Sequence, residues 1–79
     1  MNKNNVYLTK DLYEASFLYA NYLKLVGLEK EGKFFYFVFE NKEKAENLSN
    51  KYWAKEGKVI AKEYAEAIRS LKDRLYARR

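Results

Sequence analysis

The sequence predicts a single α+β domain in which a small antiparallel sheet packs with three helices. Two strand-like stretches flank a glycine in "LKLVGLEKEGKFFYFVFE", and three other segments carry apolar residues at helical spacing. A chain of 79 residues, 48% hydrophobic and 18% aromatic, supports one modest core. We therefore expect one domain over residues 1–79 in the order β-α-β-β-α-(β)-α, with residues 1–5 disordered.

The first elements are a short strand and a helix. Val6–Leu8 is rich in β-branched and aromatic character, which indicates a short strand. Thr9 is placed to cap a helix over about Lys10–Lys24, with Asp11 in its first turn. The apolar stripe of that helix is Leu12, Ala15, Tyr19, Tyr22 and Leu23.

A β-hairpin follows, with strands over Leu25–Glu29 and Lys33–Glu40. Gly32 lies between them, where a tight turn needs positive φ. On the second strand, alternation places Phe35, Phe37 and Phe39 on one face and Phe34, Tyr36 and Val38 on the other. We expect the first three rings beneath a helix layer, and the opposite face covered by the final helix or by a symmetry mate.

Two helices complete the predicted domain. Asn41 is expected to cap a helix through about Lys55, with Gly57 as its stop signal. Lys58–Ile60 is either a brief strand or an extended connection. The last helix is predicted over Ala61–Ala77, from an apolar stripe of Ile60, Tyr64, Ala67, Ile68, Leu71 and Leu75.

The net charge of +5 is concentrated toward the carboxyl end. Residues 1–40 balance to zero, whereas residues 69–79 hold five basic side chains against Asp73. A basic end indicates a polyanionic partner, DNA or RNA, although basic residues also complement the dipole of a helix end. The candidate nucleic-acid contacts are Lys51, Lys55, Lys58, Arg69, Lys72, Arg74, Arg78 and Arg79.

Several function classes are disfavoured by what the sequence lacks. It has no Cys and no His, and its glycines are too scattered to cradle a phosphate. We therefore expect a non-enzymatic protein with no catalytic residues, metal, cofactor or small-molecule substrate. No apolar run approaches a membrane span or a signal peptide, which predicts a cytoplasmic protein without a membrane partner.

A protein-interaction module is the alternative function. The first helix carries more apolar surface than a helix on one sheet face requires. Tyr13, Phe17 and Tyr22 are the candidate interface residues, in a homodimer or in an inhibitor of another protein. Trp53 is expected to pack in or beside the core.

Part of the hairpin resembles the RNA-recognition motif, whose fold follows the β-α-β-β-α-β plan. Lys33, Phe35, Phe37 and Val38 match its longer consensus, and "VYL" resembles the first-strand consensus. The resemblance implies base stacking on Tyr7, Phe35 and Phe37. Phe34, Tyr36 and Glu40 depart from the motif, and buried core is the favoured interpretation of these rings.

A second resemblance covers nearly the whole chain. "TKDLYEASFL", "VGLEKEGKFFYFVFE", a helix ending in Tyr-Trp and "KVIAKEYAEAIRSLKDRLY" occur in that order. The ordered pattern resembles a small family of domains of unknown function encoded by low-GC Gram-positive bacteria and their phages. The resemblance implies a stand-alone module of this size and no established activity. It implies no catalytic or binding residues. An accessory regulator of phage or host belongs to the nucleic-acid-binding hypothesis, which rests on the placement of charge.

Overall fold

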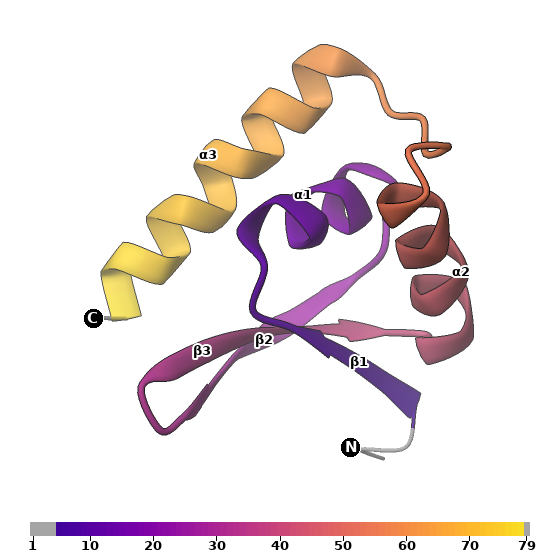
Figure 1. Ribbon diagram of the computed structural model, residues 1–79. Coiled ribbons are helices and arrows are strands. Elements are labelled where there is room, and N and C mark those ends of the chain that lie inside the picture. Colours follow the sequence, from indigo (N-terminus) through magenta and orange to yellow (C-terminus); the bar gives the residue numbers. More distant parts are fainter. Residues whose placement is uncertain (1–4, 79) are drawn as a thin grey trace.

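The computed structural model describes residues 5–78, which form an antiparallel sheet of three strands and three helices (Figure 1). The predicted α+β class is confirmed, with the order β-α-β-β-α-α. Residues 58–60 are an extended connection to the last helix and not a strand. Of the residues expected to be disordered, 1–4 lie outside the described part. The elements are β1 (Val6–Thr9), α1 (Leu12–Ala20), β2 (Leu25–Glu31), β3 (Phe34–Glu40), α2 (Lys42–Trp53) and α3 (Ala61–Arg78).

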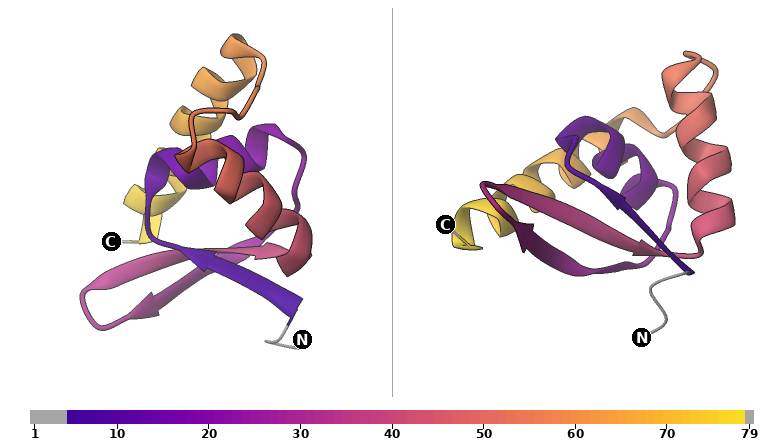
Figure 2. Two further views of the ribbon diagram at one scale, coloured as in Figure 1. Left: turned by 45° about the vertical axis from the view of Figure 1, so that its right-hand side comes forward. Right: turned by 60° about the horizontal axis from the view of Figure 1, so that its bottom comes forward.

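Strand β3 is the centre of the sheet, in the strand order β1-β3-β2. A two-residue turn that begins at Gly32, with φ of 62°, joins β2 to β3, as the sequence predicts. Pairing between β1 and β3 ends at Thr9 and Phe37, so residues 34–36 have no partner strand on that side. All three helices lie on one side of the sheet in Figures 1 and 2.

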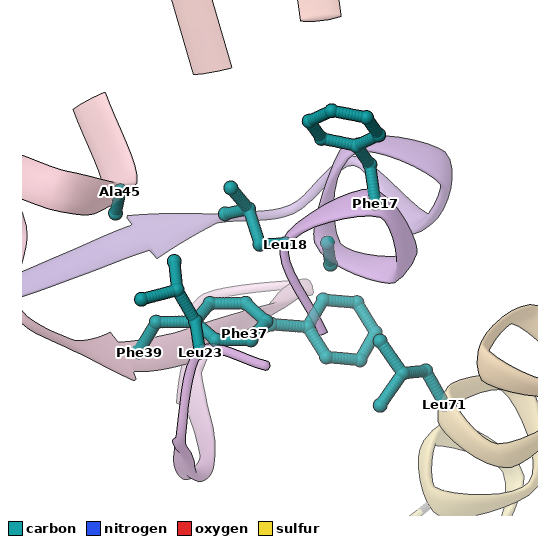
Figure 3. Close-up of a cluster of buried hydrophobic side chains, with 8 residues drawn as sticks. Phe17, Leu18, Leu23, Phe37, Phe39, Ala45 and Leu71 are labelled. Atoms are coloured by element: carbon teal, nitrogen blue, oxygen red, sulfur yellow. The ribbon is translucent and has the colours of Figure 1, made fainter. Parts of the chain in front are cut away.

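The hydrophobic core lies between the sheet and the helices. Phe37 and Phe39 are 1% and 0% exposed, and Leu71 of α3 points toward the phenylalanine rings (Figure 3). Leu18 of α1 and Ala45 of α2 complete the contact between layers. The expected inward face of β3 is therefore confirmed at two rings, and burying them supplies much of the hydrophobic stabilisation of this small domain.

Of the two coverings expected for the opposite face of β3, the final helix and a symmetry mate, the final helix does not provide one. Helix α3 packs mainly against α1, on the same side of the sheet as the other helices. Phe34 is 53% exposed and Tyr36 is half-buried, whereas Val38 is shielded by its neighbours. The three helices formed by residues 5–78 all pack on the other face of the sheet.

Helix α1 is shorter than predicted at both ends. Its N-cap is Asp11, not Thr9, because the Asp11 carboxylate accepts a hydrogen bond from the Glu14 N–H at 2.8 Å. At the other end, Tyr22 adopts φ of 70°, and the N–H of Leu23 donates to the Leu18 carbonyl. This is a Schellman motif with a tyrosine where glycine is usual, so the sequence carries no glycine signal for it.

Helix α2 begins as predicted and ends earlier. Asn41 accepts from the Lys44 N–H, whereas the helix ends at Trp53, followed by Lys55 with φ of 62°. Gly57 is therefore not the residue that reverses the helix end. Its role is steric: a Cβ there would stand 2.5 Å from the ring of Phe17. Trp53, expected to pack, is 60% exposed.

Helix α3 confirms the predicted last helix. Ala67 and Leu71 are buried against α1 and the core, and Tyr64, Ile68 and Leu75 are half-buried. The predicted apolar stripe is wrong at its first residue, because Ile60 precedes the helix and is 61% exposed. Among residues 5–78, no helix has the length and apolarity needed to cross a bilayer.

Candidate nucleic-acid interface

An open cleft of about 920 Å³ lies where the tip of the β2–β3 hairpin meets the last turns of α3 and the residues that precede α1. It exists because β1 ends before it reaches the hairpin tip, which leaves one edge of β3 uncovered. We call it the hairpin cleft. Its lining residues are Lys10, Asp11, Lys30, Gly32, Lys33, Phe34, Phe35, Phe37, Leu75 and Arg78.

The lining of the hairpin cleft is strongly basic. Four cationic side chains, Lys10, Lys30, Lys33 and Arg78, face a single carboxylate, Asp11. That carboxylate already accepts the hydrogen bond that caps α1. Cations gathered around a concave surface raise the local concentration of anions. The cleft is therefore suited to a negatively charged ligand.

Two phenylalanine rings hold lysines at the cleft. The Lys10 ammonium lies 4.2 Å from the centroid of the Phe34 ring, and the Lys30 ammonium lies 5.9 Å from that of Phe35. Lys30 and Phe35 are also directly paired across β2 and β3. Such cation–π contacts contribute about 0.5–1 kcal/mol at exposed sites, so they limit the freedom of both ammonium groups.

The basic residues singled out in the sequence do not form one surface. Arg78 lines the hairpin cleft, while Arg69, Lys72 and Arg74 are exposed along α3. The remaining three described members lie in or after the last turn of α2, near the start of α3: Lys51, Lys55 and Lys58. A helix of 18 residues is about 27 Å long, which separates these three from Arg78. Arg79 lies outside the described residues.

Three cations of the cleft come from the part of the chain whose charges balance. Lys10 follows β1, Lys30 of β2 pairs with Phe35 of β3, and Lys33 is in the hairpin turn. The net charge of this segment cannot reveal them, because residues 1–40 hold five acidic side chains against five basic ones. The useful signal is hairpin register, which places a lysine opposite an aromatic ring at the tip.

The expected stacking platform and interface are only partly exposed. Phe37, one of the three rings expected to stack on bases, is 1% exposed and belongs to the core. Phe17, expected on an exposed helix face, is 4% exposed and packs against Tyr52, with ring centroids 5.4 Å apart. Tyr13 and Tyr22 are exposed, and Tyr22 donates a hydrogen bond to Glu63 at 2.7 Å.

A buried carboxylate ties three elements together beside the core. Glu14 of α1 is 4% exposed and accepts hydrogen bonds from Thr9 and Tyr7 of β1, each at 2.7 Å. Ser49 of α2 donates to the same carboxylate. The Asp11 N–H in turn donates to the Thr9 hydroxyl at 3.1 Å. Hydroxyl donors thus take the place of water around a charge that burial would otherwise penalise.

Burial raises the pKa of two tyrosines beside the core. The pKa of Tyr7 is raised first by burial and then by its hydrogen bond to Glu14, which favours the neutral phenol. Burial is also the largest cause at Tyr64, whose pKa is raised to about 12 with smaller contributions from Tyr52, Asp11 and Tyr13. Both phenols favour the folded state only while they remain protonated.

Raising the pH above 10 is expected to destabilise the fold through Tyr64. The phenol ionises near pH 10 in the unfolded chain and near 12 in the folded one, so the unfolded state gains stability between these values. The stabilising contribution is complete below pH 10 and lost as pH rises through about 12. Urea denaturation of the protein and of Tyr64→Phe at pH 8 to 11 measures it. A stability difference between the two proteins that does not change with pH would contradict this expectation.

The described residues contain no group of three or more His, Cys, Asp or Glu side chains arranged to hold a metal ion.

No curated protein and no solved structure matches the chain. A family model, described as a domain of unknown function (DUF5659), matches residues 4–77. This match extends over the sheet, all but the last residue of α3 and the residues of the hairpin cleft except Arg78. The chain therefore belongs to the DUF5659 family of domains of unknown function.

Proposed function

We propose that this protein is a non-enzymatic nucleic-acid-binding module that holds a single strand in the hairpin cleft. The observation that carries the proposal is the convergence of four cations and an exposed aromatic ring on one open cleft. Proteins that bind single strands combine a positively charged groove for the backbone with rings on which bases stack. Lys30, Lys33 and Arg78 supply the charge, and Phe34 supplies the exposed ring.

The position of Phe34 favours a single strand over a duplex. Its ring is 53% exposed at the rim of the cleft, beside Lys10. Bases of a single strand are free to reach such a ring, whereas the bases of a duplex are stacked on one another. The two neighbouring rings do not serve in this way, because Phe37 is buried and Phe35 is half-buried.

One feature of the site opposes anion binding. The carboxyl end of a helix carries partial negative charge, and α3 ends at the cleft. Arg78 lies in its last turn and offsets that charge, with Arg74 one turn before it.

The resemblance to domains of Gram-positive bacteria and phages supports an accessory role for the module in phage or host nucleic-acid metabolism.

Reversing two charges in the hairpin cleft is expected to weaken binding strongly. In Lys30→Glu/Lys33→Glu, the affinity for a labelled single strand should fall at least about tenfold, and the salt dependence should become shallower by roughly 0.7 per lost phosphate contact. Both side chains are exposed at the hairpin tip, so the fold should be retained. Fluorescence anisotropy with single-stranded DNA and RNA, at about 50 and 200 mM salt, measures both quantities.

The matched control is Lys51→Glu/Lys58→Glu, which changes the net charge equally at the distant end of α3. It should lower the affinity by less than about threefold, the amount expected from long-range charge alone. An equal loss in both variants would show that binding depends on net charge and not on the cleft. Salt-insensitive binding, absent binding or a preference for duplex would each overturn the proposal.

A further inference from the structure

The face of the sheet that points away from the helices has an ordered distribution of charge. We call it the outer face. Its central column is apolar from Phe34 to Val38 and ends at Glu40, whereas its two edges differ in charge. Strand alternation and register assign Val6, Leu8 and, just beyond the strand, Lys10 to the β1 edge; Phe34, Tyr36, Val38 and Glu40 to the centre; and Gly27, Glu29 and Glu31 to the β2 edge.

Exposed apolar side chains occupy this face. Leu8 and Val26 are each 38% exposed and Phe34 is 53% exposed, although their strands belong to the sheet that carries the core. Val26 stands at a register shift between Leu25 and Gly27, so it and Gly27 share the position opposite Val38. A contiguous apolar surface rimmed by charges is typical of an interaction site.

We propose that the outer face binds the outer face of a second copy of this chain, with a two-fold axis parallel to β3. Such an axis keeps the central columns of both copies in contact and places the β1 edge of each copy over the β2 edge of the other. Sheets that pack face to face keep their strands nearly aligned, which this axis provides. The proposal does not rest on nucleic-acid binding, although Lys10 and Phe34 of the outer face also line the hairpin cleft.

Charge complementarity favours a second copy as the occupant. The residues opposite Tyr36 across the sheet are Glu29 on one side and, by continuation of the β1 register, Lys10 on the other. The two-fold axis therefore brings Lys10 of each copy over Glu29 of the other copy, which forms two equivalent ion pairs around an apolar centre.

The shape of the face fits the same arrangement. Val38 lies between Leu8 on one side and Gly27 on the other. The two-fold axis places the Leu8 side chain of one copy over the glycine of the other. A Cβ built at Gly27 has no heavy atom within 4 Å, so the space above this position is open in the isolated chain. Leu8 of the second copy would occupy that space.

Gly27→Lys is the decisive variant. It adds a charged side chain where the isolated chain has free space, and Gly27 does not need positive φ, so the monomer should stay folded. Sedimentation equilibrium in the absence of nucleic acid should give a dissociation constant of about 100 µM or tighter for the natural protein. The same measurement should give a constant at least about tenfold weaker for Gly27→Lys. A circular-dichroism melt confirms folding of each variant.

A charge exchange tests the orientation of the two-fold axis. Lys10→Glu and Glu29→Lys should each weaken self-association, and the double variant should return to within about threefold of the natural dissociation constant, because the pair is re-formed with reversed sign. Tyr13→Lys on the exposed side of α1 is the matched control and should leave self-association unchanged.

Three outcomes would overturn the proposal. The natural protein could remain strictly monomeric up to about 1 mM, a concentration at which even a weak specific dimer is populated. Tyr13→Lys could dissociate the dimer while Gly27→Lys does not, which would assign the interface to α1. Failure of the double variant to restore association would exclude the two-fold axis along β3.

Discussion

Replacing Phe37 with alanine is expected to lower the free energy of unfolding by about 4 kcal/mol, within the range measured for truncating a buried phenylalanine. The ring is 1% exposed and lies in the cluster formed by the sheet, α1 and α3. Native proteins have about 5–15 kcal/mol of stability in total, so this loss is a large fraction of the stability of the domain. Urea denaturation followed by circular dichroism measures the difference.

Phe34→Ala is the matched control on the same strand. It removes an equal ring that is 53% exposed on the other face, so the loss of stability should stay below about 1 kcal/mol. If both substitutions cost the same, the assignment of inner and outer faces of β3 would be wrong. The cation–π contact with Lys10 accounts for the small cost that remains.

Replacing Glu14 with alanine is expected to cost about 3 kcal/mol, through a different mechanism. The carboxylate is the shared acceptor for the hydroxyls of Thr9, Tyr7 and Ser49. Alanine leaves these donors buried without their acceptor and opens a cavity where β1, α1 and α2 meet. The comparison of urea midpoints with the natural protein gives the size of the effect.

Two further variants separate the role of this carboxylate from that of charge in general. Glu14→Gln keeps one acceptor oxygen and the side-chain volume, so it should lose about half as much stability as Glu14→Ala. Glu66→Ala removes an exposed carboxylate from α3 and should change stability by less than about 0.5 kcal/mol. Equal losses for Glu14→Ala and Glu66→Ala would exclude a structural role for the buried hydroxyl network.

Local residue chemistry predicts most of this fold and fails where the backbone adopts an unusual conformation. Gly32 and Asn41 are residue types that tolerate positive φ, so the hairpin turn and the start of α2 follow from sequence. Tyr22 and Lys55 also have positive φ, although neither type favours it. Helices α1 and α2 consequently end earlier than predicted, because the apolar pattern continues beyond the residues at which they end.

The hairpin cleft could be predicted only in part, since it depends on how segments meet. The sequence predicts a role for Arg78, because basic residues cluster near the carboxyl end. Lys30 and Lys33 join it only through the position of the hairpin tip beside α3. The exposure of Trp53 and the burial of Phe17 depend in the same way on packing between helices, which composition and spacing do not specify.

The central strand of the sheet is the last of the three to be synthesised. Both β1 and β2 need β3 as their hydrogen-bonding partner. The backbone groups of β1 therefore have no partner strand until residues 37–40 have been synthesised. Because two residues separate β2 from β3, the hairpin is expected to form within microseconds, and β1 should dock afterwards across a longer loop. Helix α1 finds its main partner only in α3, at the end of the chain. A nascent chain halted before α3 should therefore lack a stable fold, and folding should be completed only when nearly the whole chain has been made.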